Sequence, residues 1–380
     1  MFRFKLSPNI RSFRSLSHNH LFFYRLLFFG SDIISQEVLI QLHFNYALPL
    51  NNHDKILTDL QVVSHHRSMA KGKFPIHEYC QKNKLIFHEP LSSKSKDAFP
   101  GQWTEFLEKN MKEKPFDLGL ACSFGYMIPD NVIDLCKHGI IIIHPSLLPK
   151  YRGAAPVYHA LLNNEKISGI SFIDISRNKF DAGSILLQKS LEIKDNWNYK
   201  ELALGLGKLA GENVLNVIKE LKNLRMNAVI QNEKEKSGAR KIKIEETYAC
   251  WVKDDAEILR CKYKAFSGSN LHALKTIFQE KIIFIEDLEV ANEEEEIALQ
   301  VYKKIKPGGI YLLKMKKFKN NVYVNCRKGW VKINKWKFPT QMIRENHKFI
   351  NQFLNKESIY KSVDNDSPYN FDNFDPKYLS

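Results

Sequence analysis

Short apolar runs alternate with longer amphipathic segments over roughly the first 220 residues. The runs are typical of buried strands, and the segments, whose apolar positions recur with helical spacing, are typical of helices. The pattern predicts strands at 25–29, 60–64, 117–122, 139–143 and 169–175, and helices at 33–43, 76–83, 102–112, 156–163 and 199–221. Strands that alternate with helices predict a doubly wound, mainly parallel sheet, a Rossmann-like α/β domain.

The pattern changes after this region. Residues 225–244 are polar and charged, which predicts a linker. A helix around Leu259 and then several short alternating segments follow, and they predict a small β-barrel. Its strands are expected at 281–286, 298–302, 311–314, 321–325 and 330–336. We therefore divide the chain into 1–22, an α/β domain at 23–222, a linker at 223–246, a barrel at 247–350 and a tail at 351–380.

Length and charge refine this picture. A chain of 380 residues exceeds the usual size of one core and predicts two domains. The net charge of +15 indicates a polyanionic partner or an import signal, unless it reflects only a lysine-rich composition. Residues 301–340 hold twelve Lys or Arg and no Asp or Glu, interleaved with Tyr311, Phe318, Tyr323, Trp330 and Trp336. This mixture favours an RNA-binding surface with stacking platforms over lysines that only protect strand edges.

The first residues have the composition of a targeting segment. Residues 1–31 contain five Arg or Lys, several Ser and no Asp or Glu. This is typical of a mitochondrial or plastid transit peptide, which we place at 1–22, although a basic arm that binds nucleic acid has a similar composition. The six cysteines lack metal-binding spacing, so we expect reduced thiols and no metal. No apolar run is long enough to span a membrane.

The most informative stretch begins at His144 and reads His-Pro-Ser-Leu-Leu-Pro-Lys-Tyr-Arg-Gly-Ala-Ala-Pro. The apolar run 139–143 precedes it, so a buried strand delivers His144 to its carboxyl end, where parallel sheets place ligands. Pro145 and Pro149 prevent regular hydrogen bonding, and Gly153 permits a positive φ. We therefore expect a stiff, irregular loop beside the histidine.

This stretch, with Phe-Asp-Ala-Gly-Ser-Ile-Leu at 180–186, closely resembles the formyltransferases that use 10-formyltetrahydrofolate. Within them it resembles the methionyl-tRNA formyltransferase family, in particular its mitochondrial branch. The resemblance implies a Rossmann-like catalytic domain followed by an OB-like barrel that binds tRNA. It implies transfer of a formyl group from 10-formyltetrahydrofolate to the amino group of initiator methionyl-tRNA in the mitochondrial matrix. We expect a monomer that uses no metal and has no membrane partner.

The resemblance also assigns residues to the site. It implies catalytic roles for His144 and for Asp181, which the family places against the histidine. An imidazole suits the reaction because its unperturbed pKa, near 6.5, lets it donate a hydrogen bond to an oxyanion or relay a proton. The folate contacts that it implies are Phe124, Gly125, Tyr126, Met127, Ile128, Ser146, Leu147 and Pro149. The resemblance implies that a basic loop with Arg67, Lys71 and Lys73 contacts the tRNA, although these residues alone are equally consistent with a solvated charged loop. Arg152 lies in the loop after the histidine, where a guanidinium could hold a tRNA phosphate or the glutamate of the folate, unless it forms a structural ion pair.

The chain departs from the family at one position of the site. The family carries an Asn two residues before the histidine, whose amide helps to hold the oxyanion, and this chain has Ile142. Losing one such donor costs roughly 3–4 kcal/mol, about 100- to 1000-fold in rate. Ser123 and Ser146 are the hydroxyls that we consider as substitutes. Two alternatives stay open: a catalytically weakened homologue that binds tRNA or folate, and a formyltransferase for a small amine such as a sugar nucleotide or glycinamide ribonucleotide.

Overall fold

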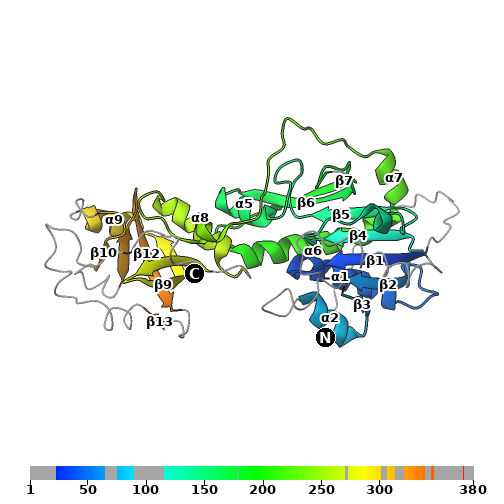
Figure 1. The fold of residues 1–380 in the computed structure, drawn as a ribbon, viewed down its shortest axis with the longest axis horizontal. Coiled ribbons are helices and arrows are strands. Elements are labelled where there is room, and N and C mark those ends of the chain that lie inside the picture. The colour runs from blue at the N-terminus through cyan, green and yellow to red at the C-terminus, as the bar shows by residue number, and fades with distance from the viewer. Residues whose placement is uncertain are drawn as a thin grey trace, which may run out of the picture.

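The structure, a computed structural model, describes residues 23–64, 75–89, 115–177, 179–269, 273–300, 306–312, 321–338, 344–345 and 371. Within them the chain forms two bodies, each built on its own β-sheet (Figure 1). Four predicted features lie outside the described residues: the transit peptide at 1–22, the loop with Arg67, Lys71 and Lys73, the helix at 102–112, and the tail at 351–380 apart from Phe371.

The first body contains a seven-stranded sheet in the order β3-β2-β1-β4-β5-β6-β7. The first five strands in this order are parallel, and β6 and β7 are antiparallel to their neighbours. This confirms the Rossmann-like, mainly parallel sheet, to which the short β3 and the half-exposed β7 add two unpredicted strands. The strands span Tyr24–Gly30 (β1), Leu57–Val63 (β2), Ile86–His88 (β3), Leu118–Cys122 (β4), Ile140–His144 (β5), Ile167–Asp174 (β6) and Ile185–Glu192 (β7).

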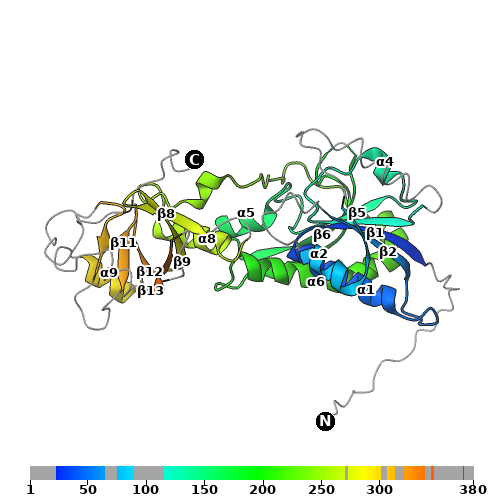
Figure 2. The same ribbon diagram turned by 60° about the horizontal axis from the view of Figure 1, so that its bottom comes forward.

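Helices cover both faces of this sheet. They span Ile33–Ala47 (α1), Pro75–Asn83 (α2), Asp130–Ile133 (α4), Pro156–Leu162 (α5), Tyr199–Lys219 (α6) and Leu221–Met226 (α7). Alternate side chains of a strand point to opposite faces. Leu26 and Phe28 of β1 therefore join the core beneath α1 and α6, which lie side by side in Figure 2. Leu27 and Phe29 join a second apolar cluster on the face of α4.

The second body is a curled antiparallel sheet in the order β10-β11-β12-β9-β8, with β13 paired to β12. Its strands span Leu274–Phe278 (β8), Lys281–Val290 (β9), Ile310–Tyr311 (β10), Val322–Asn325 (β11), Trp330–Lys337 (β12) and Arg344–Glu345 (β13). The helix α8 (Ala256–Phe266) precedes it. Such a half-barrel agrees with the barrel-like second domain that the turn spacing predicted.

The prediction of a strand at 298–302 is wrong for 298–300, the part of it that the structure describes. Ala298 and Leu299 belong instead to the helix α9 (Glu293–Leu299). Asn292 caps this helix, because its side chain accepts a hydrogen bond from the backbone N–H of Glu295 at 2.9 Å. The carboxylate of Glu295 in turn accepts one from the backbone N–H of Asn292, also at 2.9 Å. The capping box and the acidic first turn outweigh the apolar alternation that suggested a strand.

The prediction that aromatic rings of the second body are exposed for stacking is also wrong for the four rings that the structure describes. Tyr311, Tyr323 and Trp336 are fully buried, and Trp330 is 8% exposed. These rings form the core of the second body because they alternate with the polar side chains along its strands, so none of them is free to stack on a base. The fifth ring, Phe318, lies outside the described residues.

The linker between the two bodies is hydrogen-bonded to the first body. After α7 it pairs with the edge of the sheet, where Val229 and Ile185 exchange backbone hydrogen bonds of 2.8 and 2.9 Å. Further along, Gly238 forms a parallel bridge with Arg152. The chain then passes through the 3₁₀ turn η2 (Ile244–Thr247) and reaches α8, which lies against α5 (Figure 1). The polar composition predicted a linker, but the sequence did not indicate this path.

Candidate active site

Three neighbouring parallel strands end beside a cavity of about 380 Å³. Asp32 follows β1, Ser123 follows β4, and His144 is the last residue of β5; all three line the cavity. Asp181, from the loop between β6 and β7, lines it too. The volume is within the range of small-molecule sites, about 300–1,000 Å³. The fold thus brings together the predicted His and Asp at the carboxyl edge of the sheet.

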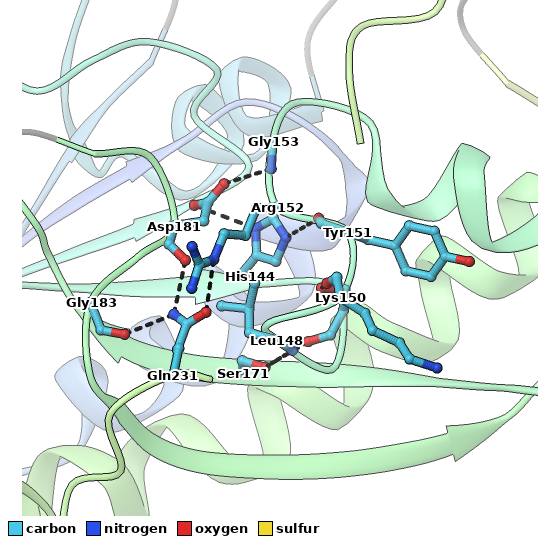
Figure 3. Close-up of polar contacts among 11 residues, drawn as sticks. His144, Leu148, Lys150, Tyr151, Arg152, Gly153, Ser171, Asp181, Gly183 and Gln231 are labelled. Carbon is cyan, nitrogen blue, oxygen red and sulfur yellow. Dashed lines mark hydrogen bonds and ion pairs between the residues drawn. The ribbon is translucent and has the colours of Figure 1, made fainter. Parts of the chain in front are cut away.

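Both ring nitrogens of His144 have defined surroundings (Figure 3). The side chain is buried, and Nε2 lies 2.9 Å from the carbonyl oxygen of Tyr151. A carbonyl only accepts hydrogen bonds, so in the neutral ring Nε2 carries the hydrogen and Nδ1 holds a lone pair. Nδ1 lies 3.5 Å from Oδ1 of Asp181. The ring is therefore oriented to take up a proton at Nδ1, where the carboxylate would stabilise the positive charge.

The backbone around Asp181 is constrained. Its φ is 52°, in the left-handed region that costs a non-glycine residue about 1–2 kcal/mol. Oδ2 accepts a hydrogen bond from the backbone N–H of Gly153 at 2.9 Å, while Oδ1 faces His144. Gly183 has no room for a side chain, because a Cβ there would lie 1.7 Å from the carbonyl oxygen of Asp174. This loop holds the carboxylate between the histidine and the loop that follows it.

Buried polar groups hold the loop that follows His144. The Ser171 hydroxyl donates to the carbonyl oxygen of Ser146 at 2.6 Å and accepts from the backbone N–H of Leu148 at 3.0 Å. The side-chain amide of Gln188 donates to the carbonyl oxygen of Leu148 at 2.8 Å. These bonds satisfy backbone groups that the two prolines keep out of regular structure. The loop is irregular and well anchored, as the sequence predicted.

Five of the eight predicted folate contacts form one wall of the cavity. They are Phe124, Gly125, Tyr126, Met127 and Ile128. The Phe124 ring is buried and packs edge-on against Phe29, with 5.4 Å between ring centroids, whereas Met127 is 45% exposed. An apolar wall that passes from a buried ring to an exposed side chain fits a flat aromatic ligand that enters from solvent.

The other three predicted folate contacts do not line the cavity. The Ser146 hydroxyl donates to the carbonyl oxygen of Lys150 at 2.7 Å, within its own loop. Leu147 packs over Gly169 of β6, where its side chain occupies the space of a Cβ. The carbonyl oxygen of Pro149 accepts from the linker, at the backbone N–H of Ser237. Their role as folate contacts stays a prediction.

Ile142 lies in the cavity wall, where the resemblance implies an amide. It packs against the apolar cluster that contains Phe124. Of the described residues that line the cavity, none carries a side-chain amide. The hydroxyl of Ser146 donates to the carbonyl oxygen of Lys150, whereas Ser123 lines the cavity. Ser146 is therefore not free to replace the missing donor.

Asp32 directly precedes the helix predicted at 33–43, a position at which Asp is typical of a helix cap. Its carboxylate does cap α1, accepting a hydrogen bond from the backbone N–H of Ser35 at 3.0 Å, but it also lines the cavity. Burial raises the pKa of this carboxyl from 3.8 to about 6, although hydrogen bonds from Ser35 and Ser123 oppose the rise. The stacked rings of Tyr158 and Tyr199, 4.3 Å apart, line the cavity as well. The position of an Asp directly after the first strand is the signal that could have revealed it.

Arg152 does not line the cavity. Its Nε donates to Oε1 of Gln231 at 2.9 Å, and its Nη1 lies 2.8 Å from Oε1 of Glu233. The linker backbone runs so close that a Cβ on Gly153 would lie 2.7 Å from the carbonyl oxygen of Ala239. The ion pair considered for Arg152 is thus present, and its contact with tRNA stays a prediction. Gln231 escaped the sequence analysis because nothing distinguishes it within a polar linker.

Among the described residues, no group of three or more His, Cys, Asp or Glu is placed to hold a metal ion. In the same part of the chain, no helix combines the length and the apolar composition that crossing a membrane requires. All six cysteines are free, and five of them are buried.

Comparison with known proteins identifies the class and then the family. A family model described as formyl transferase matches residues 90–218. HypX from Aquifex aeolicus, solved in complex with tetrahydrofolic acid, has a similar fold, with a TM-score of 0.52 and 16% identity over 90% of this chain. This chain spans about half of HypX, 48% of its length. Fold and sequence together define an α/β formyl transferase domain.

Two curated relatives narrow the class. The mitochondrial methionyl-tRNA formyltransferase of Bos taurus is 26% identical over 309 residues, 81% of this chain and 72% of the relative. The methionyl-tRNA formyltransferase of Ehrlichia ruminantium (strain Welgevonden) is 30% identical over 220 residues, 56% of this chain and 68% of the relative. The chain belongs to the methionyl-tRNA formyltransferase family.

Proposed function

We propose that this protein transfers a formyl group from 10-formyltetrahydrofolate to the amino group of initiator methionyl-tRNA for mitochondrial translation. The names of its relatives support methionyl-tRNA as the acceptor, and the formyl transferase match supports the reaction class. One observation carries the proposal: Nδ1 of His144 lies 3.5 Å from Oδ1 of Asp181, in a cavity at the carboxyl edge of the sheet.

In this proposal His144 moves the proton that the reaction displaces. Attack of an amine on a formyl carbon leaves a surplus proton on the amine nitrogen. Nδ1 of His144 accepts that proton, because Nε2–H is committed to Tyr151, and Asp181 stabilises the imidazolium. The imidazolium then protonates the nitrogen that leaves the formyl carbon. One C–N bond forms, another breaks, and one proton passes between the two nitrogens. Such acid–base catalysis contributes about 10²- to 10⁴-fold.

The negative charge on the formyl oxygen has fewer donors than the resemblance implies. Ile142 offers none, and the hydroxyl of Ser146 donates to the carbonyl oxygen of Lys150. A protonated His144 does not replace the amide, because its Nε2–H faces Tyr151 and its Nδ1–H faces Asp181. The missing amide predicts a chemical step about 100- to 1000-fold slower than it would be with the amide present.

We place the folate, which is a substrate here, against the wall formed by residues 124–128. The formyl transferase match and the tetrahydrofolate complex of HypX support a folate-derived donor. The apolar side chains of this wall suit the face of a pteridine ring, and its exposed end at Met127 leaves a path to solvent. Ser146, Leu147 and Pro149 shape the adjacent loop and complete the predicted folate set.

The tRNA would be held mainly by the second body. We propose residues 23–222 as the catalytic domain, 223–246 as the linker and 247–350 as the OB-like tRNA-binding domain. The net charge of +15 supports a polyanionic partner. Of the basic residues in 301–340, Lys306, Arg327 and Lys328 are described and exposed, and Arg327 is paired with Asp255. Arg67, Lys71, Lys73 and Arg152 are the proposed tRNA contacts of the catalytic domain.

Mitochondrial relatives suggest a mitochondrial location. We propose more specifically that residues 1–22 direct the chain to the matrix and that the mature protein works as a monomer without a metal. The binding homologue and the small-amine formyltransferase are less favoured. The relatives are named for methionyl-tRNA, and His144 and Asp181 are both present and paired.

Single-turnover formylation of methionyl-tRNA by protein lacking residues 1–22 tests the proposal. His144→Ala should lower the rate about 10²- to 10⁴-fold, and Asp181→Asn should lower it as well, with little change in melting temperature. If the unaltered protein forms no product yet binds tRNA with salt-sensitive affinity, the binding homologue replaces the enzyme. Formylation of a small amine but not of methionyl-tRNA would favour the third function.

A further inference from the structure

One linker residue contacts the backbone of the loop that carries Asp181. Residues 232–238 are exposed, but Gln231, next to them, is 6% exposed. Its side-chain nitrogen donates to the carbonyl oxygens of Asp181 and Gly183, at 2.9 and 2.8 Å. Its side-chain oxygen accepts from Nε of Arg152 at 2.9 Å. One side chain thus connects the linker, the loop of the predicted catalytic carboxylate and the loop after the histidine (Figure 3).

The two donated bonds act on a backbone that needs support. Asp181 has a φ of 52°, a conformation that persists only where the surroundings determine it. Its Oδ1 must stay near Nδ1 of His144, 3.5 Å away, for the two to share a proton. The amide of Gln231 fixes the carbonyls on both sides of this turn. A displacement of about 1 Å at such a group typically costs about 100-fold in rate.

The third bond holds the amide itself in place. Arg152 is anchored to the linker by its backbone, which donates to the carbonyl oxygen of Ser237 at 2.9 Å, and by the ion pair with Glu233. It can donate only, so it selects the orientation in which the oxygen of Gln231 faces Arg152 and the nitrogen faces the carbonyls. A carboxylate or an alkyl group at position 231 cannot make the same set of bonds.

We propose that Gln231 is a positioning residue that holds Asp181 in reach of His144, so that the interdomain linker is part of the active site. This inference rests on the proposed formyl transfer. It assigns to the linker a role in the chemical step in addition to joining the two bodies.

The test uses the protein lacking residues 1–22 and three variants in single-turnover formylation of methionyl-tRNA. Gln231→Glu keeps the shape and the acceptor for Arg152 but replaces the donor with an oxygen that faces two carbonyls. We expect the rate at saturating substrates to fall about 100-fold, with the KM for tRNA and the KM for folate each within about threefold of the unaltered protein. In Gln231→Ala water can bond the two carbonyls, so the rate should fall less than in Gln231→Glu. Asn232→Asp makes the same amide-to-carboxylate change on the exposed neighbour and should leave the rate unchanged.

A double variant separates positioning from general damage. If Gln231 acts through Asp181, then adding Gln231→Glu to Asp181→Asn should slow the enzyme no further, within about twofold. Independent, additive losses would overturn the proposal, and so would an unchanged rate in Gln231→Glu. A lower melting temperature with an unchanged rate would leave only a structural role and would also overturn it. Absence of product from the unaltered protein would be a failure of the proposed function, and is distinguishable because it precedes any comparison of variants.

Discussion

The two bodies of this protein treat their polar side chains in opposite ways. At the carboxyl edge of the seven-stranded sheet, Asp32, His144 and Asp181 all face a cavity, and Asp181 has a positive φ. In the second body, the buried Glu295 bonds the hydroxyl of Tyr323 at 2.8 Å and the ammonium of Lys332 at 3.3 Å. The first arrangement leaves charge available to a ligand at a cost in stability. The second satisfies its charges internally and gains stability from them.

Two capping positions show the difference at the level of single residues. Asp32 precedes α1, and Asp255 precedes α8. Burial raises the pKa of Asp32 to about 6. A hydrogen bond from Arg327, 2.7 Å from the carboxylate, lowers the pKa of Asp255. An Asp in front of a helix thus has a raised pKa in the site, at Asp32, and a lowered pKa outside it, at Asp255, where an arginine pairs with it.

The largest effect that we predict concerns stability in the second body. Phe371 is buried between the rings of Trp251 and Trp336, with centroids 5.6 and 5.2 Å away. Phe371→Ala should lower the free energy of unfolding by about 3–5 kcal/mol, because it leaves a cavity between these rings. Urea unfolding followed by tryptophan fluorescence measures it. Phe44→Ala, at a ring that is 65% exposed, is the control and should change little.

The rate of formyl transfer at saturating substrates should not change in Phe371→Ala, provided that the protein remains folded. A slower chemical step without a loss of stability would contradict the view that the first body holds the reaction site and that Phe371 serves only the stability of the second.

The next effect concerns the site. Ile142→Asn should raise the single-turnover rate, by up to about 100- to 1000-fold, because an amide would then face the formyl oxygen. It should also lower stability by about 1–3 kcal/mol, because an amide replaces an apolar group in the wall that contains Phe124. Ile142→Val supplies no donor and should leave the rate unchanged. An unchanged rate in the Asn variant would mean that another group already holds the oxygen.

A smaller effect depends on pH. The carboxyl of Asp32 has a higher pKa in the folded state, so its contribution to stability is present below about pH 4 and is lost as the pH rises through about 6. Asp32→Asn keeps a good helix cap and cannot ionise. The variant should therefore be more stable than the unaltered protein at pH 8, by about 1–3 kcal/mol at about 1.4 kcal/mol per pKa unit. The advantage should shrink when melting temperatures are measured at pH 5.

The smallest effect has the opposite sign. The pKa of Asp255 is lowered by Arg327, so its contribution is present above the unfolded pKa and is lost as the pH falls. Asp255→Asn should destabilise the protein slightly at pH 8, and salt should reduce the difference because the pair is exposed. Melting curves at low and high ionic strength would detect it. If both aspartate variants shifted stability in the same direction, the contrast between the two regions would not hold.

Much of the fold was predictable because its signals are local. Apolar runs marked β1, β2, β4, β5 and β6. Where short segments alternate in polarity, the local signal was ambiguous, and the capping box at Asn292 made a helix of a predicted strand. The prediction that the rings interleaved with lysines stack on RNA was wrong for the same reason. Alternation alone does not say which face of a strand is buried.

In the site, a motif was enough to predict some of the residues. His144, Asp181 and the wall at 124–128 were all predicted, and all line the cavity. Three other features became visible in the folded chain alone: Asp32 shares that cavity, the Ser146 hydroxyl bonds within its own loop, and Gln231 bonds the backbone at Asp181. The physical reason is that hydrogen bonds between distant segments depend on how the chain closes around them, and a polar linker carries no periodicity that reveals what it will contact.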